Sequence, residues 1–353
     1  MRTICRRGAV LAALALLPAL PSAAAAKGAV PPAPTAPAPA PAPAPGPAAG
    51  KIQLVLQKVG GNPLFAIAGR RFVVRGIVIP YVAGQSVKVT LYRDGRKIGV
   101  HTLAVLALGN GAGQFHLGIT SHYPGLLQAR AAHYATPQQA AFSSRSRGVR
   151  VVNPNLGPGS SGPSVRLLQS ELWGLHYVVP LSGVFDEATG RALIAYRKMT
   201  SLNRIAYAGS EVLARMSHGI GGFHVRYRHD GRHVEANLTK QVLAEIEPGG
   251  RVHAVYTMSS GKPSTPTVIG RFQVYSKTPG TNSEGMVDSN YFIRGYAIHG
   301  YAEVPTYAAS HGCLRVPIPN APAIYSWVQY GTPVDVYNEG GGGSTHVRGN
   351  AGP

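Results

Sequence analysis

The sequence predicts a multidomain, mainly β protein in which two β-rich regions flank a short helical one. Its 353 residues exceed one ordinary domain and suggest two or three. Apolar residues recur with a period of two in 51–150 and again in 234–255, and with a helical period in 164–196. The apolar fraction of 44% is enough for packed cores, which excludes a fully disordered chain.

The first residues predict export. Three arginines precede the apolar run AVLAALALLPAL, and the small residues PSAAAA follow it. This order of charged, apolar and small residues is typical of a secretory signal peptide, which we assign to 1–26. The apolar run is shorter than the roughly 20 residues that span a bilayer, so no permanent membrane anchor is expected. The pattern does not distinguish the general export route from the twin-arginine route.

Two further segments have a biased composition. Residues 27–50 are mostly proline and alanine, and repeated Ala-Pro favours extended polyproline II, so they predict a semi-rigid linker. Residues 339–353 are rich in glycine and predict a flexible tail without a function of its own.

Residues 51–152 have the pattern of an antiparallel β-sandwich. Apolar and polar residues alternate in short segments such as 52–56 and 87–91. The pair Asp94-Gly95 favours a tight hairpin turn. Several short strands separated by Gly and Pro predict an immunoglobulin-like sandwich.

The excess of positive charge is concentrated in this sandwich. The chain has 34 Lys plus Arg against 14 Asp plus Glu, and 51–150 holds 13 of these bases with one acid, Asp94. Such a region attracts polyanions. Nucleic acid is not expected, because the chain is predicted to be exported and the region lacks interleaved aromatic motifs. The expected partners are anionic cell-wall polymers bearing phosphate or carboxylate, and a basic solubilising surface is the alternative.

Residues 153–221 change to a helical period. The segment SVRLLQSELWGL places Val165, Leu168 and Leu172 on one face, and Asp186 can cap a second helix. The region resembles the small three-helix peptidoglycan-binding domains. The resemblance rests on Gly162, Val165, Leu168, Gln169, Leu172, Gly174, Tyr177, Gly183, Phe185, Asp186, Thr189, Ala192 and Tyr196. It implies peptidoglycan binding but does not assign contact residues.

Residues 222–338 predict a β domain of nearly balanced charge that contains Cys313. Because Cys5 lies in the signal, Cys313 would be the single thiol of the mature chain, which excludes an intramolecular disulfide. Cys313 stands in SHGCLRV, shortly after AIHG at 297–300. A nucleophilic thiol needs a nearby base, positive surroundings that favour thiolate, and N–H donors for an oxyanion.

The residues around Cys313 offer each of these features. His299 and His311 are candidate bases, and Arg315 adds positive charge. Gly312 permits a sharp backbone turn that can present N–H groups to a reacting carbonyl. The alternative interpretation is a small buried cysteine beside two unrelated histidines.

The motifs of this segment resemble the catalytic signature of the YkuD-type L,D-transpeptidases. The signature is G-x-A-I-H-G followed by S-H-G-C-x-R. Upstream, 259–262, 265–267 and 270–272 match the SxGKxxxPTPxGxF stretch of that family, except that Val268 and Ile269 stand between Thr267 and Gly270. The resemblance implies an all-β YkuD-type catalytic domain for 222–338.

The resemblance also implies roles for single residues. Cys313 would be the nucleophile and His299 its general base, oriented by the carbonyl of Gly300. His311 would support the loop around the thiol, and N–H groups near Gly312 and Cys313 would form the oxyanion hole. Three further residues are substrate-binding candidates, namely Ser310, Tyr296 and Arg315. The polar segment 280–294 is a flap, a substrate-binding wall or a plain surface loop.

The implied reaction consists of two acyl transfers without metal or cofactor. The cysteine attacks the L-configured centre of the third residue of a peptidoglycan tetrapeptide stem, releases D-alanine and leaves a thioester. An amine of a neighbouring stem then makes a cross-link. If water is the acceptor instead, the enzyme is an L,D-carboxypeptidase.

Three other interpretations of these residues fit the sequence less well. A zinc site of His299, His311 and Cys313 would have too few ligands for a structural site, and the close spacing of the last two is unfavourable. A sortase-like transpeptidase also uses Cys, His and Arg, but its T-L-x-T pattern is absent. A non-catalytic peptidoglycan-binding scaffold would leave Cys313 unreactive.

Overall fold

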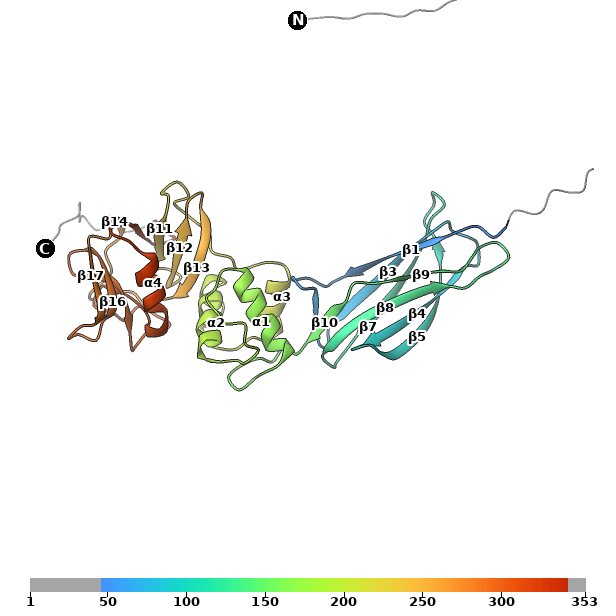
Figure 1. Ribbon diagram of the computed structural model, residues 1–353, viewed down its shortest axis with the longest axis horizontal. Helices are drawn as coiled ribbons and strands as arrows, with labels where there is room; N and C mark the ends of the chain where they lie inside the picture. The colour runs from blue at the N-terminus through green and yellow to red at the C-terminus, as the bar shows by residue number, and fades with distance from the viewer. Residues whose placement is uncertain (1–45, 342–353) are drawn as a thin grey trace, which may run out of the picture. The chain divides into compact units, whose positions relative to one another are not determined.

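The computed structural model describes residues 46–341 (Figure 1). The signal assigned to 1–26, most of the linker at 27–50 and most of the tail at 339–353 lie outside the described residues. The prediction of a mainly β chain is confirmed, since four sheets and only a few short helices form the described part.

The N-terminal strands form two sheets. The first has the order β1-β3-β7-β6 and contains β1 (Lys51–Gln57), β3 (Arg71–Ile79), β7 (Gly113–Thr120) and β6 (Leu106–Ala107). The second has the order β2-β10-β8-β4-β5, with β9 paired to β8, and contains β2 (Phe65–Ile67), β10 (Val149–Val152), β8 (Gly125–His133), β4 (Ser86–Arg93), β5 (Arg96–Ala104) and β9 (Phe142–Arg145). Side chains such as Phe72, Val89, Phe115 and Ala131 from both sheets share one core.

The predicted hairpin turn is present between β4 and β5. Asp94 and Gly95 have φ of 48° and 80°, the left-handed values that the tight hairpin turns require. The Asp94 carboxylate accepts a hydrogen bond from the Leu126 N–H at 2.8 Å. A sandwich is therefore observed, while its immunoglobulin-like assignment stays a prediction.

Three helices follow, α1 (Pro163–Gly174), α2 (Glu187–Met199) and α3 (Ser210–Ser217). Asp186 caps α2 as predicted, since its carboxylate accepts the Thr189 N–H at 2.7 Å. The apolar face of α1 is buried in a cluster that also contains strand residues from farther along the chain. The peptidoglycan-binding assignment of these helices stays a prediction.

A buried lysine links α2 to the C-terminal strands. The Lys198 ammonium donates to the Gln241 carbonyl at 3.0 Å, the Thr257 hydroxyl at 2.7 Å and the Met258 carbonyl at 2.8 Å. Burial, assisted by Arg204, lowers its pKa to about 7. Three acceptors replace the water that the ammonium loses, which is what makes a buried lysine tolerable.

The C-terminal segment contains two more sheets and a short helix. The five-stranded sheet has the order β13-β12-β11-β19-β14 and contains β11 (His233–Asn237), β12 (Val242–Glu247), β13 (Arg251–Thr257), β14 (Gly270–Gln273) and β19 (Pro333–Tyr337). The four-stranded sheet has the order β15-β16-β17-β18 and contains β15 (Ser276–Thr281), β16 (Val287–Ile293), β17 (Tyr296–Tyr301) and β18 (Leu314–Pro317). Both sheets contribute to one apolar core.

Two details of this segment differ from the expectation. The all-β prediction was wrong in one respect, because a 3₁₀ turn (Ile318–Asn320) leads into α4 (Ala321–Trp327), which buries Ile324 and Trp327. This helix is only seven residues long and begins among prolines, so it lacks a readable helical period. The segment 280–294 is mostly strand, since β15 ends and β16 lies within it.

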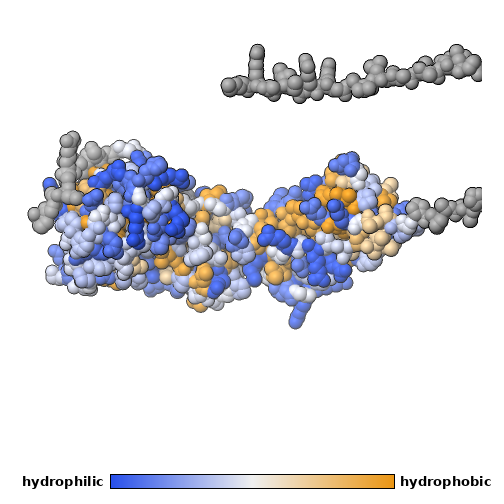
Figure 2. Space-filling view, turned by 45° about the horizontal axis from the view of Figure 1, so that its top comes forward, coloured by the Kyte–Doolittle hydropathy of each residue, from blue (hydrophilic) through white to orange (hydrophobic). Residues whose placement is uncertain are grey.

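The surface differs between these regions. Hydrophilic residues cover most of the C-terminal segment on the face shown in Figure 2, whereas the sandwich surface mixes hydrophobic and hydrophilic residues. In residues 46–341, no helix has the length and apolar character needed to cross a membrane.

Candidate active site

Cys313 and His299 come from neighbouring parallel strands. β17 and β18 pair in parallel, with His299 opposite Arg315, and Cys313 immediately precedes β18. Successive residues of a strand point to opposite faces. Ile298 and Leu314 are buried in the core between the sheets, so the side chains of His299 and Arg315 lie on the other face. Cys313, two residues before Arg315, is placed at the same edge of that face.

The Tyr301 ring contacts both the His299 imidazole and the Arg315 guanidinium. Its ring meets the His299 ring edge-on at a centroid distance of 5.7 Å, and the Arg315 guanidinium lies 4.0 Å from its centroid. A cation over an aromatic ring is held by the negative face of the ring. Tyr301 follows His299 by two residues and therefore shares its face, a signal that strand periodicity could have supplied.

The orientation of His299 follows from one hydrogen bond. Its Nδ1 lies 2.9 Å from the Gly300 carbonyl oxygen. Since a carbonyl only accepts, Nδ1 carries the proton and Nε2 is left with a lone pair. Burial lowers the pKa of His299, and the charge of Arg315 adds to this, so the ring is neutral at neutral pH. Packing leaves no space for a side chain at Gly300, because a Cβ there would lie 2.7 Å from the Cβ of Ala321.

Cys313 is free and only partly buried. Its thiol donates weakly to the Gly295 carbonyl at 3.6 Å. Burial raises the pKa of the Cys313 thiol, and the opposing effects of a backbone hydrogen bond and of Arg315 do not cancel it. Arg315 acts in the expected direction, since its charge favours thiolate, but desolvation by burial outweighs it. Burial thus favours the neutral thiol of Cys313 and also the neutral imidazole of His299.

Ser310 closes the loop that carries the thiol. Its hydroxyl donates to the Cys313 carbonyl at 2.6 Å and accepts the Gly312 N–H at 3.0 Å. The side chain is 1% exposed. The structure thus places this substrate-binding candidate inside the loop, with its hydroxyl already occupied.

The upstream motif holds the same loop from the other side. The Ser310 N–H donates to the Ser260 carbonyl and the Lys262 N–H to the Ser310 carbonyl, each at 2.9 Å. The Thr267 hydroxyl donates to the Gly312 carbonyl at 2.8 Å and accepts the Gly261 N–H at 2.8 Å. The motif residues therefore act as a cradle for the cysteine loop.

The cradle also orients the peptide between Gly312 and Cys313. In a trans peptide the C=O and N–H point in opposite directions. Because the Gly312 carbonyl faces Thr267, the Cys313 N–H points away from Thr267. The Gly312 N–H is engaged by Ser310. Of the two expected oxyanion donors, the geometry leaves the Cys313 N–H.

Tyr296 and His311 lie on either side of this loop. Gly312 has a φ of 126°, and a Cβ there would lie 2.3 Å from Cε1 of Tyr296, so the tyrosine ring packs directly on the glycine. His311 is exposed, and its Nε2 lies 3.3 Å from the Lys262 Nζ. The structure brings Tyr296 against the cysteine loop but leaves His311 on its outer surface.

The turn between β15 and β16 reaches the same site. The Asn282 side chain accepts the N–H groups of Glu284 and Met286 at 3.0 and 2.9 Å, which fixes the turn. The Glu284 charge acts to raise the pKa of both His299 and Cys313. Glu284 was not singled out from the sequence, because only the strand pairing brings it near the thiol.

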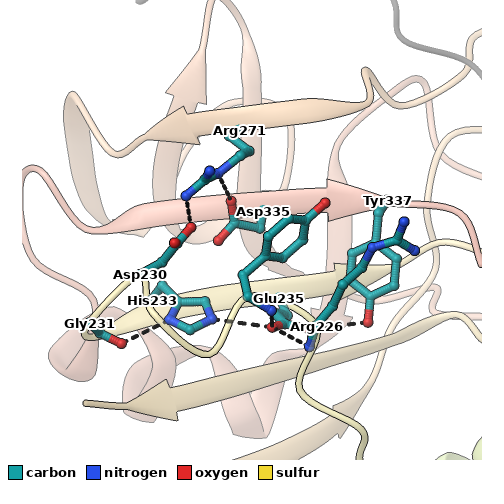
Figure 3. Close-up of polar contacts among 9 residues, drawn as sticks. Arg226, Asp230, Gly231, His233, Glu235, Arg271, Asp335 and Tyr337 are labelled. Carbon is teal, nitrogen blue, oxygen red and sulfur yellow. Dashed lines mark hydrogen bonds and ion pairs between the residues drawn. The ribbon is translucent and has the colours of Figure 1, made fainter. Parts of the chain in front are cut away.

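A second polar cluster lies on the five-stranded sheet and is shown in Figure 3. The buried Glu235 carboxylate accepts the Arg226 N–H at 2.8 and 3.0 Å, the Tyr227 N–H at 2.7 Å and the Tyr337 hydroxyl at 3.2 Å. Its register partner Asp335 accepts from the Arg271 guanidinium at 3.1 Å. These contacts fix the segment that enters β11, and none of them involves the sheet of Cys313.

No metal arrangement is present in the described part of the chain, since no group of three or more His, Cys, Asp and Glu side chains could hold an ion there. The groups that the structure gathers around the Cys313 thiol are a buried imidazole, an adjacent guanidinium and one backbone N–H donor.

Comparisons with known proteins identify the segment. The YkuD family model, described as the L,D-transpeptidase catalytic domain, matches residues 231–336. An L,D-transpeptidase structure from Xylanimonas cellulosilytica is 33% identical, covering 52% of this chain and 97% of that one, with a TM-score of 0.49.

Two other solved structures are more distant. An L,D-transpeptidase from Stackebrandtia nassauensis is 19% identical, covering 54% of this chain and 98% of that one, with a TM-score of 0.35. A Cys-to-Ser mutant of the Enterococcus faecium L,D-transpeptidase is 27% identical over 30% of this chain and 50% of that one, with a TM-score of 0.27. The curated proteins gave no match. By its family match and its sequence identity, the chain belongs to the L,D-transpeptidase family and carries a YkuD catalytic domain.

Proposed function

We propose that the chain is an exported peptidoglycan L,D-transpeptidase that uses Cys313 as nucleophile and His299 as general base. The observation that carries the proposal is the placement of a partly exposed thiol and a buried imidazole on one face of the β17–β18 pair. The donor substrate is a tetrapeptide stem, and the first product is D-alanine.

The raised pKa of the thiol sets the order of proton transfer. Because the thiol is neutral at rest, His299 Nε2 takes the Sγ proton as sulfur attacks the carbonyl carbon of the third stem residue. The carbonyl electron pair moves to oxygen, where the Cys313 N–H donates a hydrogen bond. When the tetrahedral intermediate collapses, the imidazolium gives its proton to the departing D-alanine amine, and a thioester remains.

The second half-reaction reverses these roles. An amine of a neighbouring stem attacks the thioester, His299 takes a proton from it, and the thiol is restored with that proton. The product is a cross-link between two third residues. If water attacks, the same residues produce a free tripeptide instead.

Opposite charges flank the reacting pair. Arg315 lies over Tyr301, and Glu284 acts on both reacting groups from the β15–β16 turn. In our proposal Arg315 binds a substrate carboxylate, and Glu284 an ammonium group. Tyr296 forms the wall beside Gly312.

The remaining regions fit an enzyme that works at the cell wall. The signal pattern at 1–26 supports export, and the helical motif of 153–221 supports binding to peptidoglycan. In this proposal the helices hold the enzyme on its polymer, and the Pro/Ala-rich linker acts as a spacer.

The test is a product analysis with a purified tetrapeptide stem. Incubation should release D-alanine and yield a cross-linked dimer, a free tripeptide, or both, and their ratio assigns the acceptor. Cys313→Ala should abolish D-alanine release, and His299→Ala should slow it by about two to four orders of magnitude. The matched control His224→Ala changes an exposed histidine and should leave the rate unchanged. Persistent release by the Cys313 variant would reject the mechanism.

A further inference from the structure

The outer face of the second sandwich sheet holds a shallow depression of about 280 Å³. Val87, Val89 and Leu91 of β4 are buried in the sandwich core, so the alternating residues Lys88, Thr90 and Tyr92 point outward. The register places Thr90 opposite Arg130 of β8, and Tyr134 and Ser143 also line the depression.

The two cations of the depression lack acidic partners. None of the ion pairs found among residues 46–341 involves the sandwich. The single acid of this region, Asp94, accepts the Leu126 N–H at the hairpin turn. Arg130 makes only a long 3.5 Å contact with the Ser143 hydroxyl, and the Lys88 ammonium lies 5.0 Å from the centre of the Tyr134 ring. Unpaired Lys and Arg side chains that converge on a hollow favour an anionic group.

One further feature indicates a ligand with a ring rather than a bare anion. Tyr92 and Tyr134 offer amphipathic aromatic surfaces beside the cations, and Tyr134 is 61% exposed. His133 also lines the depression, but it shares the buried side of β8 with Leu127 and Ala131 and is 5% exposed, so it supports the site from beneath and does not contact the ligand.

We propose that this depression is a binding site for a saccharide that carries a phosphate or carboxylate group. Lys88 and Arg130 bind the anion, and Tyr134 packs on the sugar ring. The site is separate from the Cys313 chemistry and does not depend on it. It would let the sandwich attach the enzyme to an anionic glycan.

The test measures binding of the full chain to four small probes by isothermal titration calorimetry. A phosphorylated mannose oligomer and tetragalacturonate carry the two anionic groups, maltotetraose is neutral, and tripolyphosphate is an anion without sugar. At least one anionic saccharide should bind, and maltotetraose should bind at least about tenfold more weakly. The anionic saccharide that binds with the higher affinity shows whether the site prefers phosphate or carboxylate.

Two paired variants separate a built site from diffuse charge. Lys88→Gln with Arg130→Gln should lower affinity for the anionic saccharide at least about tenfold. The control, Arg96→Gln with Arg147→Gln, removes the same charge from exposed positions outside the depression and should change affinity less than about threefold. Equal losses in both pairs would overturn the proposal, because they would show that only net charge matters.

A third variant tests the sugar contact. Tyr134→Ala should lower the affinity for the anionic saccharide several-fold and leave the affinity for tripolyphosphate unchanged. If tripolyphosphate binds as tightly as the saccharides, or if neither anionic saccharide binds, the proposal fails. Turnover of a soluble stem peptide should be the same in all these variants, so this failure is distinguishable from failure of the proposed enzymatic function.

Discussion

The Ser310 hydroxyl bridges the Cys313 carbonyl, at 2.6 Å, and the Gly312 N–H, at 3.0 Å. One buried side chain thus closes the turn that presents the nucleophile. Because the Gly312 N–H donates to Ser310, it is not available to bind an oxyanion. The Thr267 hydroxyl binds the Gly312 carbonyl, so the Cys313 N–H of the same peptide points away from Thr267. The position of the thiol and the direction of its N–H donor are therefore set together.

Replacing Ser310 by Ala should lower kcat of the proposed reaction by about 10- to 100-fold, because small displacements of a reacting group are costly. KM should change little, since the buried hydroxyl has no room for substrate. Steady-state kinetics with the stem peptide provide the measurement. Ser310→Thr keeps the hydroxyl and should recover part of the rate. A Ser310→Ala enzyme with raised KM and normal kcat would assign the residue to substrate binding instead.

The pH dependence of the reaction should separate base catalysis from preformed thiolate. Burial lowers the pKa of His299 below its usual 6.5 and raises the pKa of Cys313 above its usual 9.0. Turnover should therefore be lost only below pH 6.5, where the imidazole becomes protonated. Alkylation by iodoacetamide should keep rising above pH 9.0 in His299→Ala, in which no base assists the thiol. A fast alkylation plateau at neutral pH in that variant would show a resting thiolate and contradict the mechanism.

The two flanking charges predict opposite shifts of this profile. Glu284 acts to raise the pKa of His299 and of Cys313, while Arg315 acts to lower both. Glu284→Gln should move the acidic limb of the kcat profile to lower pH, and Arg315→Gln should move it to higher pH. The shift in Glu284→Gln should shrink at high salt, because Glu284 is exposed. Shifts of the same sign in the two variants would exclude electrostatic action on the pair.

Local patterns predicted much of this molecule. The hairpin at Asp94 and the cap at Asp186 follow from residues next to each other in sequence, and both are present. The motifs singled out Cys313 and its loop, whereas the contacts by which the upstream motif holds this loop were found only in the structure. The features that depend on strand pairing and burial could not be predicted from local patterns. The approach of Glu284, the position of the Arg315 guanidinium over the Tyr301 ring, and the raised thiol pKa all depend on burial or on contacts across the sheet.

A buried carboxyl should make the stability of the fold pH-dependent. Glu245 is 1% exposed, its Oε1 lacks a hydrogen-bond partner, and its Oε2 accepts from the Tyr256 hydroxyl at 3.2 Å. Burial raises its pKa from 4.5 to about 8. Between these two values the folded chain holds a proton that the unfolded chain has lost. The free energy of unfolding should therefore fall as pH rises through this window, by up to about 1.4 kcal/mol per pH unit from this group.

Glu245→Gln removes the titrating proton while keeping the shape of the side chain. In urea unfolding at pH 5.5 and pH 8.5, the variant should lose less stability between the two conditions than the native chain does. The exposed carboxylate of Glu187, whose side chain is 96% accessible, offers the matched control, and Glu187→Gln should keep the native pH dependence. If the two variants show the same dependence, Glu245 is charged in the folded state, and its charge is compensated by Arg232 or His253 rather than neutralised by a proton.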